Sequence, residues 1–125
     1  MSVSRHSIRI IVEGVGEAEG ELTRVTAPLT VEGITKILPV SGRTSIWKDA
    51  EVYFNVPFKA GSEKPVKEAK KGAIAYWPLG GAICIFYEDL VPYSPVNLIG
   101  RVIKGLEIFS QVRNGMAIRL ERLSG

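Results

Sequence analysis

The sequence has little of what most catalytic and metal-binding sites require. Its 125 residues include one cysteine, Cys84, and one histidine, His6. No disulfide can form within the chain, and this pair cannot supply the three or four nitrogen and sulfur ligands of a zinc site. A Ser-His-Asp or Cys-His arrangement is equally unsupported, because neither an asparagine nor an acid stands beside His6. We therefore expect no metal site, no cofactor and no hydrolytic triad.

The chain also lacks long apolar runs and a strong charge of one sign. No segment approaches the about 20 apolar residues that cross a bilayer, and the first residues lack the apolar core of a signal peptide. The 16 basic and 13 acidic residues give a formal net charge of +3, spread along the chain. Such a small excess is not typical of nucleic-acid binding. We expect a cytoplasmic protein with neither a membrane nor a nucleic acid as partner.

Two compositional biases concern the polar residues. Asparagine and glutamine are scarce whereas Glu, Lys and Arg are plentiful, a bias reported for proteins of thermophiles. Lysines gather in residues 59–71, but Glu63 and Glu68 interrupt them, and Gly61 and Pro65 place the stretch on a loop. This stretch fits either a solvated surface loop or a site for an anionic partner.

Short segments of β-branched and aromatic residues dominate the chain. At 46% hydrophobic residues, its length suffices for one domain with one core. Residues 72–77 and 82–87 are apolar on both faces, as in central strands that are covered on each side. The patterns together predict strands over residues 6–14, 21–25, 43–47, 51–56, 72–77, 82–87, 97–103 and 116–121.

Two short helices interrupt these strands. Apolar residues at spacings of four, three and four predict a helix over 27–38, with Thr26 as its N-cap and Pro39 as its end. A second helix of under two turns is predicted over residues 106–112. Because so many short strands cannot leave their apolar faces and edges open, we expect a mainly β domain over residues 1–125. A closed antiparallel β-barrel is favoured over a sandwich.

Aromatic residues come from segments that converge on one region of the predicted barrel. They are Trp47, Tyr53, Phe54, Phe58, Tyr76, Trp77, Phe86 and Tyr93. Such rings can pack the mouth of a barrel or form the wall of a binding groove, and both interpretations stay open. The binding interpretation places a peptide or small ligand between residues 43–58 and the turn at 76–81. Its predicted contacts are Trp47, Tyr53, Asn55, Tyr76, Trp77 and Phe86.

The order of the predicted elements resembles that of the cyclophilins. Residues 96–106 resemble the cyclophilin stretch of apolar strand, Phe-Gly-x-Val, Gly-Met and short helix, and residues 20–38 resemble its second strand and first helix. The chain is more similar still to small cyclophilin-like barrel proteins of archaea and thermophilic bacteria, whose members lack an assigned role. Their signatures recur here as Trp47, Glu-x-Tyr-Phe-x-x-Pro at 51–57, Gly-x-x-x-Tyr-Trp-Pro at 72–78 and Val-Asn-x-Ile-Gly at 96–100.

The resemblance implies a cyclophilin-like barrel and a possible prolyl isomerase site, built from an arginine and an apolar proline pocket. The cyclophilin arginine falls on Ser45, the phenylalanine pair on residues 84–85 and the histidine on Val96. Arg43 lies two residues before Ser45, on the same face of a strand, and is the candidate catalytic residue. A solvated surface arginine is the other interpretation of this position. We expect a module that binds a peptide or small ligand, with a prolyl isomerase that uses Arg43 as the alternative.

Overall fold

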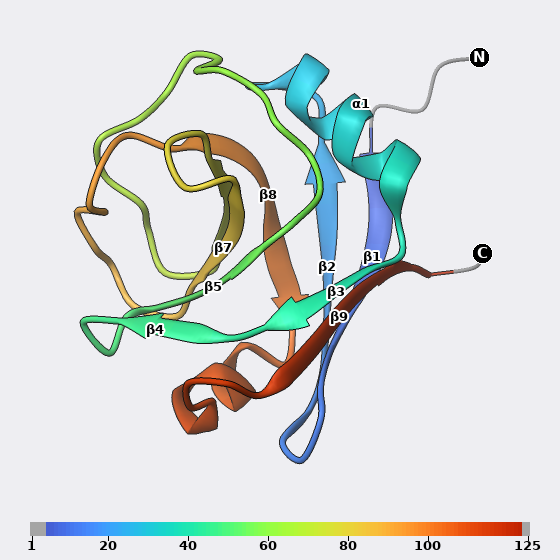
Figure 1. Ribbon diagram of the computed structural model, residues 1–125, viewed down its shortest axis with the longest axis vertical. Helices are drawn as coiled ribbons and strands as arrows, with labels where there is room; N and C mark the ends of the chain where they lie inside the picture. The colour runs from blue at the N-terminus through green and yellow to red at the C-terminus, as the bar shows by residue number, and fades with distance from the viewer. Residues whose placement is uncertain (1–4, 124–125) are drawn as a thin grey trace.

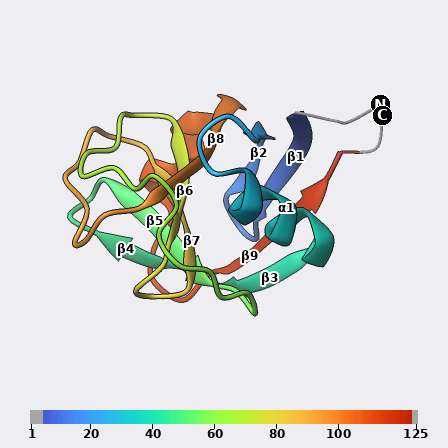
Figure 2. The same cartoon turned by 90° about the horizontal axis from the view of Figure 1, so that it is seen from above.

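Residues 5–123, the part of the chain that the computed structural model describes, form a nearly closed antiparallel barrel of nine strands (Figures 1 and 2). The strands follow the order β3-β9-β1-β2-β8-β6-β7-β5-β4. This arrangement confirms the predicted closed β-barrel. The strand bounds are Arg5–Val12 (β1), Gly16–Thr23 (β2), Val40–Arg43 (β3), Ser45–Trp47 (β4), Glu51–Asn55 (β5), Ala73–Trp77 (β6), Ala82–Phe86 (β7), Asn97–Lys104 (β8) and Ala117–Arg122 (β9).

The first hairpin is tighter than the sequence predicts. β1 and β2 pair along their whole length, so the second strand begins at Gly16 and not at Glu21. The glutamates of this segment therefore lie on a strand, and Glu17 and Glu21 form ion pairs with neighbouring strands. Arg9 lies 3.4 Å from Glu17, and Arg101 lies 3.1 Å from Glu21. Exposed pairs contribute at most about 1 kcal/mol each, so the buried face of the hairpin supplies most of its stability.

The barrel closes through a bend at Thr44, where one predicted strand becomes two. β3 ends at Arg43 and pairs with β9, whereas β4 begins at Ser45 and pairs with β5. The buried Thr44 hydroxyl donates a hydrogen bond to the Arg113 carbonyl and accepts one of 2.9 Å from the Met116 amide. The first and last strands of the sheet order are thus separated in the chain by this residue alone.

Two helices lie at opposite ends of the barrel (Figure 1). The α-helix α1 spans Pro28–Ile37 and buries Val31 and Ile34 in the barrel core. The 3₁₀-helix η1 spans Leu106–Gln111 and buries Phe109. Both helices were expected from the sequence, and η1 takes the tighter form that is common in short helices. Neither helix of the described chain is long and apolar enough to cross a membrane.

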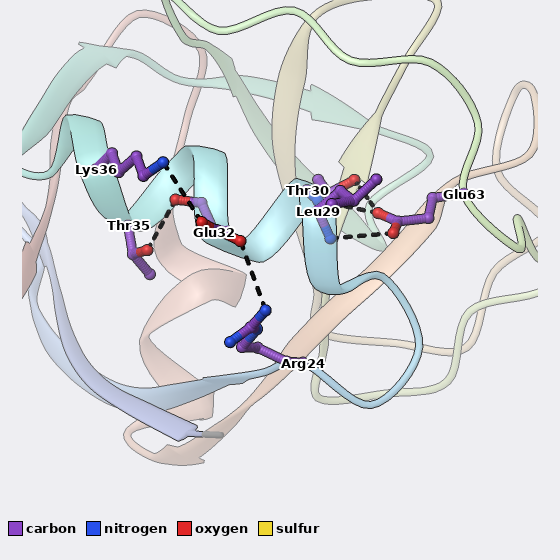
Figure 3. Close-up of polar contacts among 7 residues, drawn as sticks. All are labelled: Arg24, Leu29, Thr30, Glu32, Thr35, Lys36 and Glu63. Atoms are coloured by element: carbon purple, nitrogen blue, oxygen red, sulfur yellow. Dashed lines mark hydrogen bonds and ion pairs between the residues drawn. The ribbon is translucent and has the colours of Figure 1, made fainter. Parts of the chain in front are cut away.

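A distant glutamate, and not the predicted Thr26, caps the start of α1. No cap residue of this helix makes a side-chain hydrogen bond. Instead, the Glu63 carboxylate accepts hydrogen bonds from the Leu29 amide at 3.0 Å and from the Thr30 amide at 2.9 Å (Figure 3). Burial raises the pKa of Glu63, but these hydrogen bonds outweigh it and lower the pKa below its ordinary value. The lysine-rich loop over residues 59–71 is therefore tied to α1.

Asn97, which is fully buried at the start of β8, completes the attachment of this loop. Its side-chain carbonyl accepts a hydrogen bond of 2.9 Å from the Glu63 amide. Its side-chain amide donates to the Gly61 carbonyl at 3.0 Å and to the Thr30 hydroxyl at 3.2 Å. Because a buried amide is costly without partners, these bonds fix the loop, the helix and β8 against one another.

Side chains pack on both faces of strands β5 to β8. Alternate residues such as Tyr76 point into the barrel core, whereas their neighbours form a second cluster outside. The loops over 59–71 and 88–96 cover this outer cluster and are joined to each other by bridges between Val66 and Val96 and between Ala69 and Leu90. The prediction that the central strands are covered on each side is confirmed, and every residue of β7 is buried. The outer cluster consists of Ala69, Ala75, Cys84, Phe86 and Val96.

The bend at Thr44 gives a direct test of how the barrel closes. Thr44→Val keeps the shape of the side chain but leaves the Arg113 carbonyl and the Met116 amide without their hydroxyl partner. We expect the free energy of unfolding to fall by about 1–3 kcal/mol in urea titrations. Thr44→Ser, which keeps the hydroxyl, should lose less. Equal losses in the two variants would show that packing, and not the hydroxyl, holds the bend.

Candidate functional site

A small cavity lies on the outer face of the barrel wall, between the strands and the segment over residues 90–96. Its volume is about 230 Å³. Binding sites for drug-sized molecules measure about 300–1,000 Å³, so this cavity fits a small molecule or a single side chain. Figures 1 and 2 show β4 and the chain after β7 on one side of the barrel, away from β1 and β2. The cavity is lined by Trp47, Glu51, Tyr53, Trp77, Pro92, Tyr93 and Val96.

The alternation of β5 and β6 brings the strand residues of the cavity to one face. Val52 and Phe54 belong to the barrel core, so Glu51 and Tyr53 point outward. Trp77 reaches the same face from the end of β6. On the neighbouring strand β4, Trp47 pairs directly with Glu51. The barrel wall therefore presents three aromatic rings around one carboxyl group.

The aromatic rings form a box with edge-to-face contacts. The Tyr93 ring centroid lies 6.1 Å from that of Trp47 and 6.1 Å from that of Trp77, at interplanar angles of 90° and 73°. Tyr53 meets Trp77 at 5.8 Å and 84°. The indole N–H of Trp77 donates a 2.5 Å hydrogen bond to the Ser94 hydroxyl. Each such ring pair contributes about 0.5–1.5 kcal/mol. These contacts hold the rings in place without a ligand.

Glu51 is the charged residue in the cavity lining, and it is only 5% exposed. Within residues 5–123, no basic side chain lies within ion-pair distance of its carboxylate. Burial raises the pKa of Glu51, and a hydrogen bond with the Cys84 thiol opposes this shift only in part. Burial and the neighbouring Glu51 charge together raise the pKa of the Cys84 thiol well above its ordinary value. The carboxylate is thus held in an apolar setting without a compensating charge.

Trp47 adds two features to this wall. Its indole N–H is buried and has no hydrogen-bond acceptor among the described residues. The ammonium group of Lys48 lies 5.4 Å from the centroid of the Trp47 ring, in the geometry of a cation–π contact. This ring therefore already accepts a positive charge from within the chain.

The structure brings together only part of the binding set that the sequence predicts. Trp47, Tyr53 and Trp77 line the cavity, whereas Tyr76 and Phe86 are fully buried and lie outside it. The Tyr76 ring points into the barrel, where its hydroxyl donates a hydrogen bond to the Phe58 carbonyl. Phe86 fills the outer cluster beneath the loops. Asn55 lies outside the cavity and donates a 2.7 Å hydrogen bond to the Gly80 carbonyl, which ties β5 to the β6–β7 turn.

Arg43 also lies outside the cavity. It is exposed on β3 and donates a 3.3 Å hydrogen bond to the Gly115 carbonyl. The wall of the cavity does include Val96, on which the resemblance places the cyclophilin histidine. The period of two puts Arg43 and Ser45 on one face only in a continuous strand, and the bend at Thr44 separates them.

Sequence reasoning missed four members of the lining: Glu51, Pro92, Tyr93 and Val96. The sequence places Tyr93 among the converging aromatic residues but does not mark it as a binding residue. Glu51 carried the clearest unused signal, because it is an acid in a short strand next to aromatic residues. Among residues 5–123, no group of three or more His, Cys, Asp and Glu side chains could hold a metal ion.

The fold and the aromatic cavity define a small cyclophilin-type barrel with a preformed pocket on its outer wall. The chain belongs to the Cyclophilin-like family, whose model matches residues 6–121. It is similar to the hypothetical protein AF2241 from Archaeoglobus fulgidus, with 32% identity, a TM-score of 0.83 and coverage of 98% of both chains.

A more distant structure shares the fold alone. It is McbB in complex with tryptophan, with 14% identity and a TM-score of 0.80 over 94% of this chain. The matched region spans 45% of the McbB chain. The search of curated proteins by sequence found no match.

The unpaired Glu51 carboxylate predicts an unusual pH dependence of stability. Since its pKa is raised in the folded state, Glu51 costs stability as pH rises from below its ordinary value of 4.5 through the folded pKa. Glu51→Gln should therefore raise the melting temperature at pH 7.5 and leave it nearly unchanged at pH 3.5. Differential scanning calorimetry at the two pH values measures this, with the exposed Glu13→Gln as control. A variant less stable than the wild type at pH 7.5 would mean that the folded protein stabilises the charge.

Proposed function

We propose that this protein is a binding module that holds a small ligand, or one side chain of a peptide, in the aromatic cavity on its outer wall. The observation that carries the proposal is the box of Trp47, Trp77 and Tyr93 around Glu51. Apolar walls with one placed polar group are typical of small-molecule sites, because the walls supply affinity and the polar group orients the ligand.

The way in which the chain holds these rings at the edge of the cavity favours a role in binding over a role in core packing. The segment that carries Tyr93 is held at Leu90 and Val96 by bridges to the lysine-rich loop, and Ser94 is hydrogen-bonded to Trp77. Yet Tyr93 itself is 71% exposed. A large ring held at the rim of a cavity, and not buried within it, adds little to the core. It leaves an apolar surface that a ligand can cover.

The same arrangement gives the prolyl isomerase alternative no support. Arg43 is engaged with the Gly115 carbonyl and lines no part of the cavity. Lowering the barrier of about 20 kcal/mol to X-Pro rotation needs a donor beside the bound proline. The charged group of the cavity is the carboxylate of Glu51, which offers no such donor when ionised.

The likeness to McbB does not identify a ligand for this cavity. McbB is described in complex with tryptophan, but at 14% identity it shares only the fold and locates no ligand in this chain. A cytoplasmic location and a thermophilic source belong to the proposal on the grounds of composition.

The two tryptophans of the chain, Trp47 and Trp77, both line the cavity, so their emission reports directly on occupancy. We expect benzyl alcohol, a small uncharged aromatic probe, to change this emission in a saturable way. Tyr93→Ala removes one wall of the cavity and should weaken binding about three- to tenfold. Because Tyr93 is exposed, the variant should stay folded.

The matched control for this titration is Val91→Ala. Val91 is 64% exposed on the same loop and does not line the cavity, so this variant should bind as the wild type does. A titration without saturation in the wild-type protein, or equal weakening by both substitutions, would contradict the proposed site.

A further inference from the structure

We propose that the cavity selects an organic cation, and specifically a substituted ammonium group, with Glu51 as its counter-charge and the rings of Trp47, Trp77 and Tyr93 as its cage. This inference rests on the proposed function and adds the chemical class of the ligand. It joins two features of the cavity that are independent of each other, a carboxylate and a set of aromatic faces.

The first feature is the uncompensated charge. Glu51 is only 5% exposed, so its carboxylate loses much of its hydration, and no side chain within residues 5–123 returns an ion pair to it. The Cys84 thiol, which forms a hydrogen bond with this carboxylate, is a weak donor. A bound cation would supply the missing charge inside a site from which water is largely excluded, where the attraction is stronger than in bulk solvent.

The second feature is the orientation of the rings. Aromatic faces carry the negative part of the ring quadrupole and attract cations within about 6 Å of the centroid. Trp47 and Trp77 are each held edge to face with Tyr93, so the three rings present differently directed surfaces to the cavity. The Lys48 ammonium lies 5.4 Å from the centroid of the Trp47 ring, within the range of a cation–π contact. Lys48 does not line the cavity and forms no ion pair with Glu51, so the carboxylate stays available.

The form of the cation follows from the polar groups that the wall offers. A primary ammonium carries three donors, and each needs an acceptor when it is buried. The cavity provides the Glu51 carboxylate, while most of its remaining wall is aromatic ring, proline and valine. A trimethylated ammonium has no N–H donor to satisfy and spreads its charge over methyl groups that pack against rings. Cages of this composition recognise quaternary ammonium groups in general.

The selectivity can be measured with three probes of one shape class: benzyltrimethylammonium, benzylamine and benzyl alcohol. Tryptophan emission and isothermal calorimetry at pH 7.5 follow binding to the full chain. We expect the wild type to bind benzyltrimethylammonium at least about tenfold more tightly than benzyl alcohol, with benzylamine between them. Glu51→Gln, which keeps the shape of the side chain, should lower the affinity for benzyltrimethylammonium about tenfold. Val91→Ala, which lies outside the cavity, should keep the wild-type affinity for each probe within about twofold.

The outcomes separate this inference from the proposed function. If benzyl alcohol binds as tightly as the cation, or if Glu51→Gln leaves the cation affinity unchanged, the ligand class is wrong while the cavity stays a binding site. If none of the three probes binds the wild type, both proposals are overturned. The melting temperature of Glu51→Gln, which should be at least that of the wild type at pH 7.5, shows that the variant is folded, so a loss of cation binding cannot be assigned to unfolding.

Discussion

The bend at Thr44 is the constraint on which the rest of the molecule depends. It sends β3 to pair with β9 and β4 to pair with β5, so one short segment joins both ends of the sheet order. A straight strand from Val40 to Trp47 could not serve both neighbours. Because the Thr44 hydroxyl meets both the Arg113 carbonyl and the Met116 amide, the bend is held from within. It also sets the direction of β4 and thereby places Trp47 opposite Glu51.

The candidate site exists because the barrel wall is covered from outside as well as filled from inside. Glu63 fixes the lysine-rich loop to α1 (Figure 3). Asn97 fixes the same loop to β8, and the loop in turn holds the segment that carries Tyr93. Hydrogen bonds at one end of the loop thus support an aromatic wall at the other. The cost of this construction is a desolvated carboxylate at Glu51, and strained or uncompensated groups of this kind cluster at functional sites.

Local patterns predicted much of the fold, because alternation and helical spacing are local properties. The central strands were placed within about one residue, and the α1 helix ended before Pro39 as expected. What failed depended on distant partners: the split at Thr44 requires the β9 side of the barrel, and the cap of α1 comes from Glu63. For the site, alternation put Glu51 and Tyr53 on one face but could not show that loops cover that face. Periodicity does not tell which buried face a cavity adjoins, so the sequence alone cannot separate Tyr76 and Phe86 from the residues that line it.

We infer above all that a cation enters the space between Glu51 and the indole rings. Two-dimensional ¹H–¹⁵N NMR tests it directly, since the chain has two indole N–H groups and both belong to this wall. During titration with benzyltrimethylammonium, the indole signals of Trp47 and Trp77 should shift together, and both shifts should saturate with a stoichiometry of one ligand per chain. Shifts confined to amides elsewhere, with both indole signals unmoved, would contradict the claim.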